Sequence, residues 1–212
     1  MSSEPTSQPT PVPKPEKSRL LQDGRDMFWS MAPLVVACIV LAGMLGMCSF
    51  QAGGPGAGPA PEFDAPAALQ ADADTLKIPI RLPQLPEGWQ PNSGSRHGID
   101  GGLTLPDGQH GRAVSSRIGY LAPNGKYLSL TQSNADEAAL VASIKPDSYA
   151  AGTQDVDGVT WVVYESSDPE PVWTTRLSGP AQVAITGAGG TDEYRTLASA
   201  TQKQSPLPIK RP

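Results

Sequence analysis

The side chains best suited to chemistry gather in one glycine-rich segment, residues 92–112. It holds both histidines of the chain, His97 and His110, together with Arg96, Asp100 and Asp107. Imidazole and carboxylate groups are zinc ligands, but a segment so rich in glycine predicts no helix or strand that would fix their geometry. We therefore interpret the segment as a surface loop. An envelope hydrolase or a metal-dependent enzyme using the His97/His110 loop is the alternative.

Other catalytic patterns are weaker. Ser95, His97 and Asp100 have the residue types of a hydrolytic triad, but they are too close in sequence to form the usual relay, and no G-x-S-x-G motif is present. The glycines at 187–190 precede an expected helix and could cradle a phosphate. The acidic pair Asp192 and Glu193 would repel such an anion, so a tight turn is the better interpretation. We expect no catalytic residue, no metal and no cofactor.

Amphipathic aromatic rings offer a different kind of site. On an open sheet face or in a cleft they would bind an apolar or glycan ligand. Together with the charged and imidazole groups of the glycine-rich segment, the predicted ligand-binding residues are Trp89, Arg96, His97, Tyr120, Trp161 and Trp173.

The region that must position these residues reads as an α+β domain. Asn124-Gly125 supplies the positive φ angles of a hairpin turn between expected strands over 114–122 and 126–133. Further strands are expected over 158–165, 171–177 and 181–186, whose short spacing suits an antiparallel meander. Helices are expected over 65–77, over 135–144 with Asn134 as its N-cap, and over 192–201. The predicted fold is an antiparallel sheet with about three helices packed on it, all on one face.

A long uncharged run, Met27–Phe50, precedes this domain. About 20 apolar residues in a helix span the hydrocarbon core of a bilayer. The run therefore predicts a single transmembrane helix, and its predicted transmembrane residues include Leu34, Val35, Val36, Ile39, Val40, Leu41 and Leu45.

The distribution of basic residues predicts how this helix is oriented. Lys14, Lys17, Arg19 and Arg25 precede it, and no further Lys or Arg follows until Lys77. The positive-inside rule then places the N-terminus in the cytoplasm and the domain outside the cell membrane. Cleavage and lipidation at Cys48 is the alternative.

The remaining segments complete the domain organisation. We expect a disordered cytoplasmic tail over 1–26, the membrane helix over 27–50, a flexible Gly/Pro linker over 51–62, the extracytoplasmic domain over 63–201 and a disordered tail over 202–212. The net charge of −5 arises after the predicted helix. This argues against nucleic acid as a partner. The small pair Ala42 and Gly46 would permit a weak homodimer through the helix.

Four passages of the chain resemble a known family. They are Arg25-Asp26-Met27 with Ser30-Met31, Leu85–Trp89 continuing to Pro91-Asn92-Ser93, Gly119–Ser133, and Ala184–Ala198. Over roughly Gly24–Thr201 they are similar to an uncharacterised family of single-pass, membrane-anchored actinobacterial proteins known only as a domain of unknown function. The resemblance implies a membrane-anchored topology and no activity.

The leading functional hypothesis combines these observations. We expect a membrane-anchored, non-enzymatic extracytoplasmic module that binds a lipid or glycan of the cell envelope, or a partner protein. Two alternatives stay open: the enzyme described above, and a membrane scaffold that acts through its helix.

Overall fold

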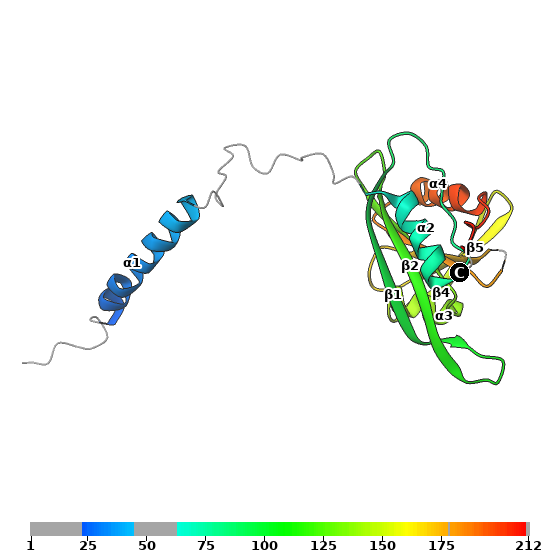
Figure 1. Cartoon of the computed structure of the whole chain (residues 1–212), viewed down its shortest axis with the longest axis horizontal. Helices are drawn as coiled ribbons and strands as arrows, with labels where there is room; N and C mark the ends of the chain where they lie inside the picture. The colour runs from blue at the N-terminus through cyan, green and yellow to red at the C-terminus, as the bar shows by residue number, and fades with distance from the viewer. Residues whose placement is uncertain (1–22, 45–62, 178, 211–212) are drawn as a thin grey trace, which may run out of the picture. The chain divides into compact units, whose positions relative to one another are not determined.

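The computed structural model describes residues 23–44, 63–177 and 179–210. These residues belong to two compact units, Met1–Gly58 and Pro59–Pro212 (Figure 1). The predicted linker over 51–62, Cys48, Gly46 and most of the predicted N-terminal tail lie outside the described residues.

The described part of the first unit is one helix, α1 (Asp23–Met44), with Pro33 inside it. Its large apolar side chains are exposed, and Phe28 and Trp29 are each about 70% exposed. The predicted transmembrane residues that lie in the described range are all at least 50% exposed: Leu34, Val35, Val36, Ile39, Val40 and Leu41. No helix in the described ranges has both the length and the hydropathy to cross a membrane. The predicted span over Met27–Phe50 is thus not confirmed, and its residues 45–50, including Leu45, lie outside the described ranges.

The second unit is built on a seven-stranded sheet in which all neighbours are antiparallel, in the order β1-β2-β3-β7-β6-β5-β4. It consists of two meanders joined where β3 pairs with β7, which confirms the predicted α+β class. The strands are β1 (Gln90–Thr104), β2 (His110–Leu121), β3 (Tyr127–Ser133), β4 (Tyr149–Val156), β5 (Val159–Glu165), β6 (Val172–Arg176) and β7 (Gln182–Gly187).

Three helices pack on this sheet: α2 (Ala65–Leu76), α3 (Glu137–Ile144) and α4 (Thr191–Gln202). The sequence predicted that all three would pack on one face of the sheet, and this prediction is wrong. Successive side chains of a strand point to opposite faces. In β7, Val183 and Ile185 join the core cluster of α2 and α4. Ala184, between them, joins a second cluster formed with α3. The sheet is therefore covered on both faces.

The glycine-rich segment is not the predicted loop. Residues 92–112 form most of β1, the turn after it and the start of β2, and this long hairpin is prominent in Figure 1. Pairing of β1 with β2 runs from Gln90↔Leu121 to Thr104↔His110, with irregularities after Pro91 and after Ile99, and it holds Gly94 and Gly98 in the strand. Gly101, at the second irregularity, and Gly108, in the turn, have positive φ angles of 66° and 80°. Low intrinsic strand propensity is overridden here by the pairing of β1 with β2, whose other edge bonds to β3.

Three smaller features of the structure differ from the prediction. Strand β4 is not among the strands that the sequence predicted. Asn134 is not the cap of α3, which has Asp136 at that position; the Asn134 side chain instead accepts a hydrogen bond from the amide of Val114 at 2.8 Å. The residues after α4 do not form a frayed tail but are bonded to α2 and the segment after it. The Leu207 amide donates to the Ile80 carbonyl, and the Lys210 amide donates to the Asp74 carboxylate.

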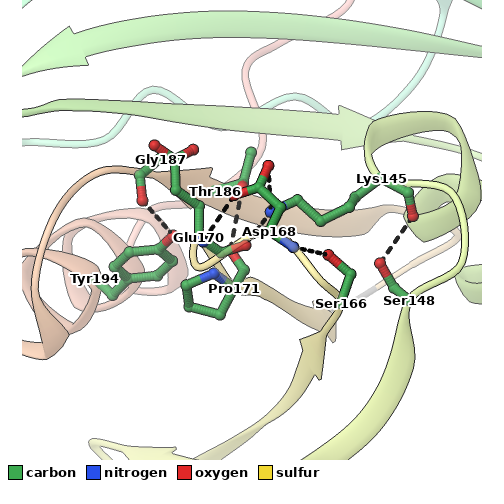
Figure 2. Close-up of polar contacts among 9 residues, drawn as sticks. All are labelled: Lys145, Ser148, Ser166, Asp168, Glu170, Pro171, Thr186, Gly187 and Tyr194. Atoms are coloured by element: carbon green, nitrogen blue, oxygen red, sulfur yellow. Dashed lines mark hydrogen bonds and ion pairs between the residues drawn. The ribbon is translucent and has the colours of Figure 1, made fainter.

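Polar contacts from the end of α3 and from α4 hold the loop between β5 and β6 in place (Figure 2). Lys145, just after α3, forms an ion pair with Asp168 at 3.2 Å and donates to the Glu170 carbonyl. From α4, the Tyr194 hydroxyl donates to the carbonyls of Pro171 and Gly187, both at 2.9 Å. Burial raises the pKa of Tyr194 above its ordinary value, so this hydroxyl keeps its proton and remains a donor.

Replacing Tyr194 with phenylalanine should lower the free energy of unfolding by about 1–2 kcal/mol. The Gly187 carbonyl loses a buried hydroxyl donor, and the Pro171 carbonyl keeps only the hydrogen bond from the Thr186 hydroxyl, at 3.1 Å. Urea denaturation followed by circular dichroism would measure the change. Tyr127→Phe is the matched control, since Tyr127 is 37% exposed; we expect a change below about 0.5 kcal/mol. Equal effects of the two substitutions would contradict the assigned role of Tyr194.

The N-terminus of α3 predicts a pH-dependent contribution to stability. The Asp136 carboxylate accepts hydrogen bonds from the hydroxyl and the amide of Thr104, at 2.6 and 2.8 Å, and these bonds lower its pKa. A carboxyl whose pKa is lower when folded stabilises the protein above its unfolded pKa, and the effect is lost as pH falls through the folded pKa. Asp136→Asn should therefore destabilise the protein at about pH 7 and much less at about pH 3. Urea denaturation at both pH values tests this, and a pH-independent difference would contradict it.

Candidate functional site

A cavity of about 320 Å³ lies between α2 and the β1–β2 hairpin. Its walls come from the chain just before α2, from α2 itself and from both strands of the hairpin. The lining residues are Phe63, Ala68, Asp72, Gly94, Ser95, Arg96 and Ile118. One of these, Arg96, is a predicted ligand-binding residue.

The apolar wall of this cavity depends on a glycine. A Cβ atom at Gly94 would lie 2.4 Å from Cζ of Phe63 and 3.1 Å from Cδ1 of Ile118. Only the absence of a side chain lets the Phe63 ring come this close to β1 beside Ile118. Any larger residue would have to displace the ring and would change the shape of the cavity.

The polar wall is an ion pair anchored inside the protein. Asp72 is only 4% exposed. Its Oδ1 accepts a hydrogen bond from Nε of Arg96, and its Oδ2 accepts one from the Ser116 hydroxyl. A buried carboxylate needs such partners because charge is costly to bury. The ion pair therefore fixes the position of the Arg96 guanidinium against α2.

This arrangement leaves the two Nη atoms of the Arg96 guanidinium available to bind a ligand. The Arg96 side chain is 46% exposed. Within the described residues, none of its hydrogen bonds uses an Nη atom, since the contact to Asp72 is made through Nε. Two parallel N–H groups of a guanidinium match the oxygens of a carboxylate or phosphate. The cavity thus combines an apolar wall with a fixed donor for an anion.

Arg112 offers a useful contrast on the same face of the hairpin. Its guanidinium lies across Gly98, because a Cβ there would be in contact with it. It pairs with Asp100 at 3.5 Å, but the two side chains are 69% and 92% exposed. Such an exposed pair contributes little to stability. Arg112 lies outside the cavity and serves below as a control for Arg96.

The predicted aromatic site residues are mostly core residues. Tyr120, Trp161 and Trp173 are 2%, 0% and 4% exposed, and Trp89 packs half-buried against the same cluster. The Trp161 indole donates to Gln202 at 3.0 Å, and the Trp173 ring lies 5.1 Å from that of Tyr194. Burial raises the pKa of Tyr120 above its ordinary value. Tyr120, Trp161 and Trp173 are thus packed inside the domain and offer no open face to a ligand.

The histidines are not brought together. His97 follows Arg96 in β1 and so points to the opposite face of the sheet, where its Nε2 lies 3.0 Å from the Ser95 hydroxyl. His110 pairs with Thr104 near the far end of the hairpin. In the part of the chain that the structure describes, no three His, Cys, Asp or Glu side chains form a metal-binding group. The proposed enzyme site in residues 92–112 gains no support from this geometry.

Sequence analysis missed three important residues of the cavity: Phe63, Asp72 and Gly94. A signal for Asp72 was present, because it lies between Leu69 and Ala73 on the buried side of α2. A lone carboxylate in an apolar helix stripe indicates a paired, functional or positioning group. Gly94 carried no comparable signal among the many glycines near it.

Comparison with known proteins adds a family but no activity. A family model described as a protein of unknown function (DUF4245) matches residues 19–201. No curated protein and no solved structure matches the chain. The resemblance to an uncharacterised family is thereby confirmed, while the actinobacterial origin and the membrane anchor that it implied stay predictions.

Proposed function

The chain belongs to the DUF4245 family of proteins of unknown function, and we propose that it is a membrane-tethered, non-enzymatic binding module. Its folded domain would lie outside the cell membrane and bind an amphipathic anion of the cell envelope. The ligand would place its apolar part against Phe63 and Ile118 and its acidic group on Arg96.

The main support for this proposal is that the cavity has an apolar wall on one side and the fixed guanidinium of Arg96 on the other. A volume of about 320 Å³ is at the small end of ligand pockets, which range over roughly 300–1,000 Å³. It suits a short acyl segment with one acidic group better than a whole lipid. Arg96 is held by Asp72 before any ligand arrives, so little conformational entropy is lost when the acid binds.

Two features of the N-terminal region support the tether. The run Met27–Phe50 contains no charged residue, and the large apolar side chains of α1 are exposed. Exposed apolar groups on a helix need an apolar environment, and a bilayer provides one. The basic residues before Met27 favour a cytoplasmic N-terminus.

Arg96→Gln tests the binding site directly. We expect the full-length protein to bind octanoate more tightly than octanol, and Arg96→Gln to lower octanoate affinity about tenfold through loss of a charge-assisted hydrogen bond. Octanol affinity should stay unchanged. Isothermal titration calorimetry would measure both ligands, with Arg112→Gln as the matched control. Equal octanoate binding by wild type and Arg96→Gln would contradict the proposal.

The tether has its own test, which does not depend on the ligand. The full-length chain should remain in the membrane pellet after a carbonate wash, and deletion of residues 27–50 should release it. Protease added to intact spheroplasts should digest the domain but not a reporter fused to the N-terminus. A full-length chain found in the soluble fraction would contradict the membrane tether, whatever the result with octanoate.

A further inference from the structure

A second cavity, of about 450 Å³, lies toward the sheet edge opposite to β1. It is bounded by α4, by the turn between β4 and β5, and by the chain at residues 84–86. Its lining is rich in polar side chains, unlike the apolar wall formed by Phe63 and Ile118. The two cavities therefore suit different ligands.

One stripe of α4 supplies most of the polar groups. Arg195, Ser199 and Lys203 follow one another at intervals of four residues, beginning in α4 and ending at its C-cap, so they lie on the same side of the helix. Thr196 and Ala200, also spaced by four, continue the stripe along the cavity. The opposite side of α4 is buried and holds the helix on the sheet through Tyr194, Leu197, Ala198 and Thr201.

The turn between β4 and β5 adds a carboxylate. Asp157 and Gly158 have φ angles of 49° and 81°, as expected for a two-residue hairpin turn with Asp-Gly. The Asp157 carboxylate accepts hydrogen bonds from Lys203 Nζ at 2.8 Å and from the Ser199 hydroxyl at 2.6 Å. The bond from Lys203, followed by that from Ser199, lowers the pKa of Asp157. Asp157 is thus ionised near neutral pH and offsets the charge of Lys203.

Arg195 differs from Lys203 because its hydrogen bonds go to neutral groups. Its Nη1 donates to the Asp155 carbonyl at 2.9 Å and its Nη2 to the Gln154 side-chain oxygen at 2.8 Å. These bonds orient the guanidinium without cancelling its charge. Two cations, Arg195 and Lys203, against one anion, Asp157, leave a net charge of +1 among the three groups.

We propose that this cavity is a second binding site, for an acidic group on a hydroxylated skeleton, as in a sugar phosphate or a uronic acid. Arg195 and the free N–H groups of Lys203 would bind the acidic oxygens. The amides of Gln84 and Gln204 and the hydroxyl of Thr196 would pair with the hydroxyls of the ligand. The site goes beyond the proposed binding of an amphipathic anion, because it requires no acyl chain.

The experiment measures the binding of glucose 6-phosphate, glucuronate and glucose to the full-length protein by isothermal titration calorimetry. At least one of the two acidic sugars should bind, and which one binds better distinguishes a phosphate from a carboxylate ligand. Glucose should bind at least about tenfold more weakly, because it lacks the charged acceptor. Arg195→Gln should lower the affinity for the acidic sugar about tenfold for the same reason. Equal binding of glucose and both acidic sugars, or no binding of either acid, would overturn the proposal.

Three variants separate this site from structural effects and from the first cavity. Asp157→Asn should tighten binding of the acidic sugar, because it removes the negative charge beside the ligand; weaker binding would instead assign Asp157 a purely structural role and overturn the proposal. Arg96→Gln and Arg112→Gln should leave the affinity unchanged, and a loss in Arg96→Gln equal to that in Arg195→Gln would overturn the assignment to this cavity. Thermal unfolding of each variant confirms that it is folded.

Discussion

Trp161→Ala should lower the free energy of unfolding of the folded domain by about 3–5 kcal/mol, the usual range for removing a buried aromatic residue. Trp161 is 0% exposed and belongs to the main core cluster. The substitution removes its apolar contacts and leaves a cavity. It also removes the indole donor to Gln202, whose oxygen is then left without that partner. Since whole domains are stable by about 5–15 kcal/mol, much of the protein would unfold at moderate urea concentrations.

Circular dichroism is the appropriate measurement for Trp161→Ala, because the substitution also removes an intrinsic fluorophore. Tyr149→Ala is the matched control: Tyr149 lies on the neighbouring strand β4 and is 59% exposed, so we expect a change within about 0.5 kcal/mol. If Trp161→Ala changed stability no more than Tyr149→Ala, Trp161 would not be a core residue. It would again be a candidate for the ligand-binding role that the sequence suggested.

The secondary structure that local signals specify was predicted well. The turn at Asn124-Gly125, the apolar alternation in β3 and the acidic first turn of α4 each depend on neighbouring residues, and the sequence shows them directly. At the turn, only Gly125 has the expected positive φ angle, 78°, and Asn124 does not. Strands β1 and β4 lacked such signals. Both are edge strands of the sheet with mostly exposed residues, so their sequences show little of the apolar alternation that identifies a half-buried strand.

The candidate site was predicted only in part, for a related reason. Arg96 was identified as a charged residue near glycines, but its partner Asp72 is 24 residues away in a helix. The sequence cannot show that α2 lies over the hairpin, nor that Arg96 and His97 point to opposite faces, before β1 is known to be a strand. The aromatic residues were assigned to a ligand because amphipathic rings occur both in cores and at binding sites. Only their burial distinguishes the two roles.

Gly187→Ala is the second substitution with a large expected effect, and its cause is the backbone. Gly187 ends β7 with φ = 147°, and a Cβ there would lie 2.3 Å from the Tyr127 carbonyl oxygen and 2.7 Å from Cα of Leu128. Both neighbours are main-chain atoms of β3, which cannot move aside as a flexible side chain would. Backbone strain of about 1–3 kcal/mol and overpacking of about 1–3 kcal/mol give an expected loss of about 2–6 kcal/mol.

Gly152→Ala is the matched control for this glycine. Gly152 also lies in a strand, β4, but it has no positive φ, and a Cβ there would meet nothing within 4 Å. Alanine at this position should leave stability unchanged within about 0.5 kcal/mol, or raise it slightly by restricting the unfolded chain. Urea denaturation of the two variants compares a glycine required by close backbone packing with one that is not. If Gly187→Ala were as stable as Gly152→Ala, the close approach of β3 and β7 at Gly187 would be wrong. The Tyr194 hydroxyl bond to the Gly187 carbonyl would then need a new explanation, because it depends on the same backbone position.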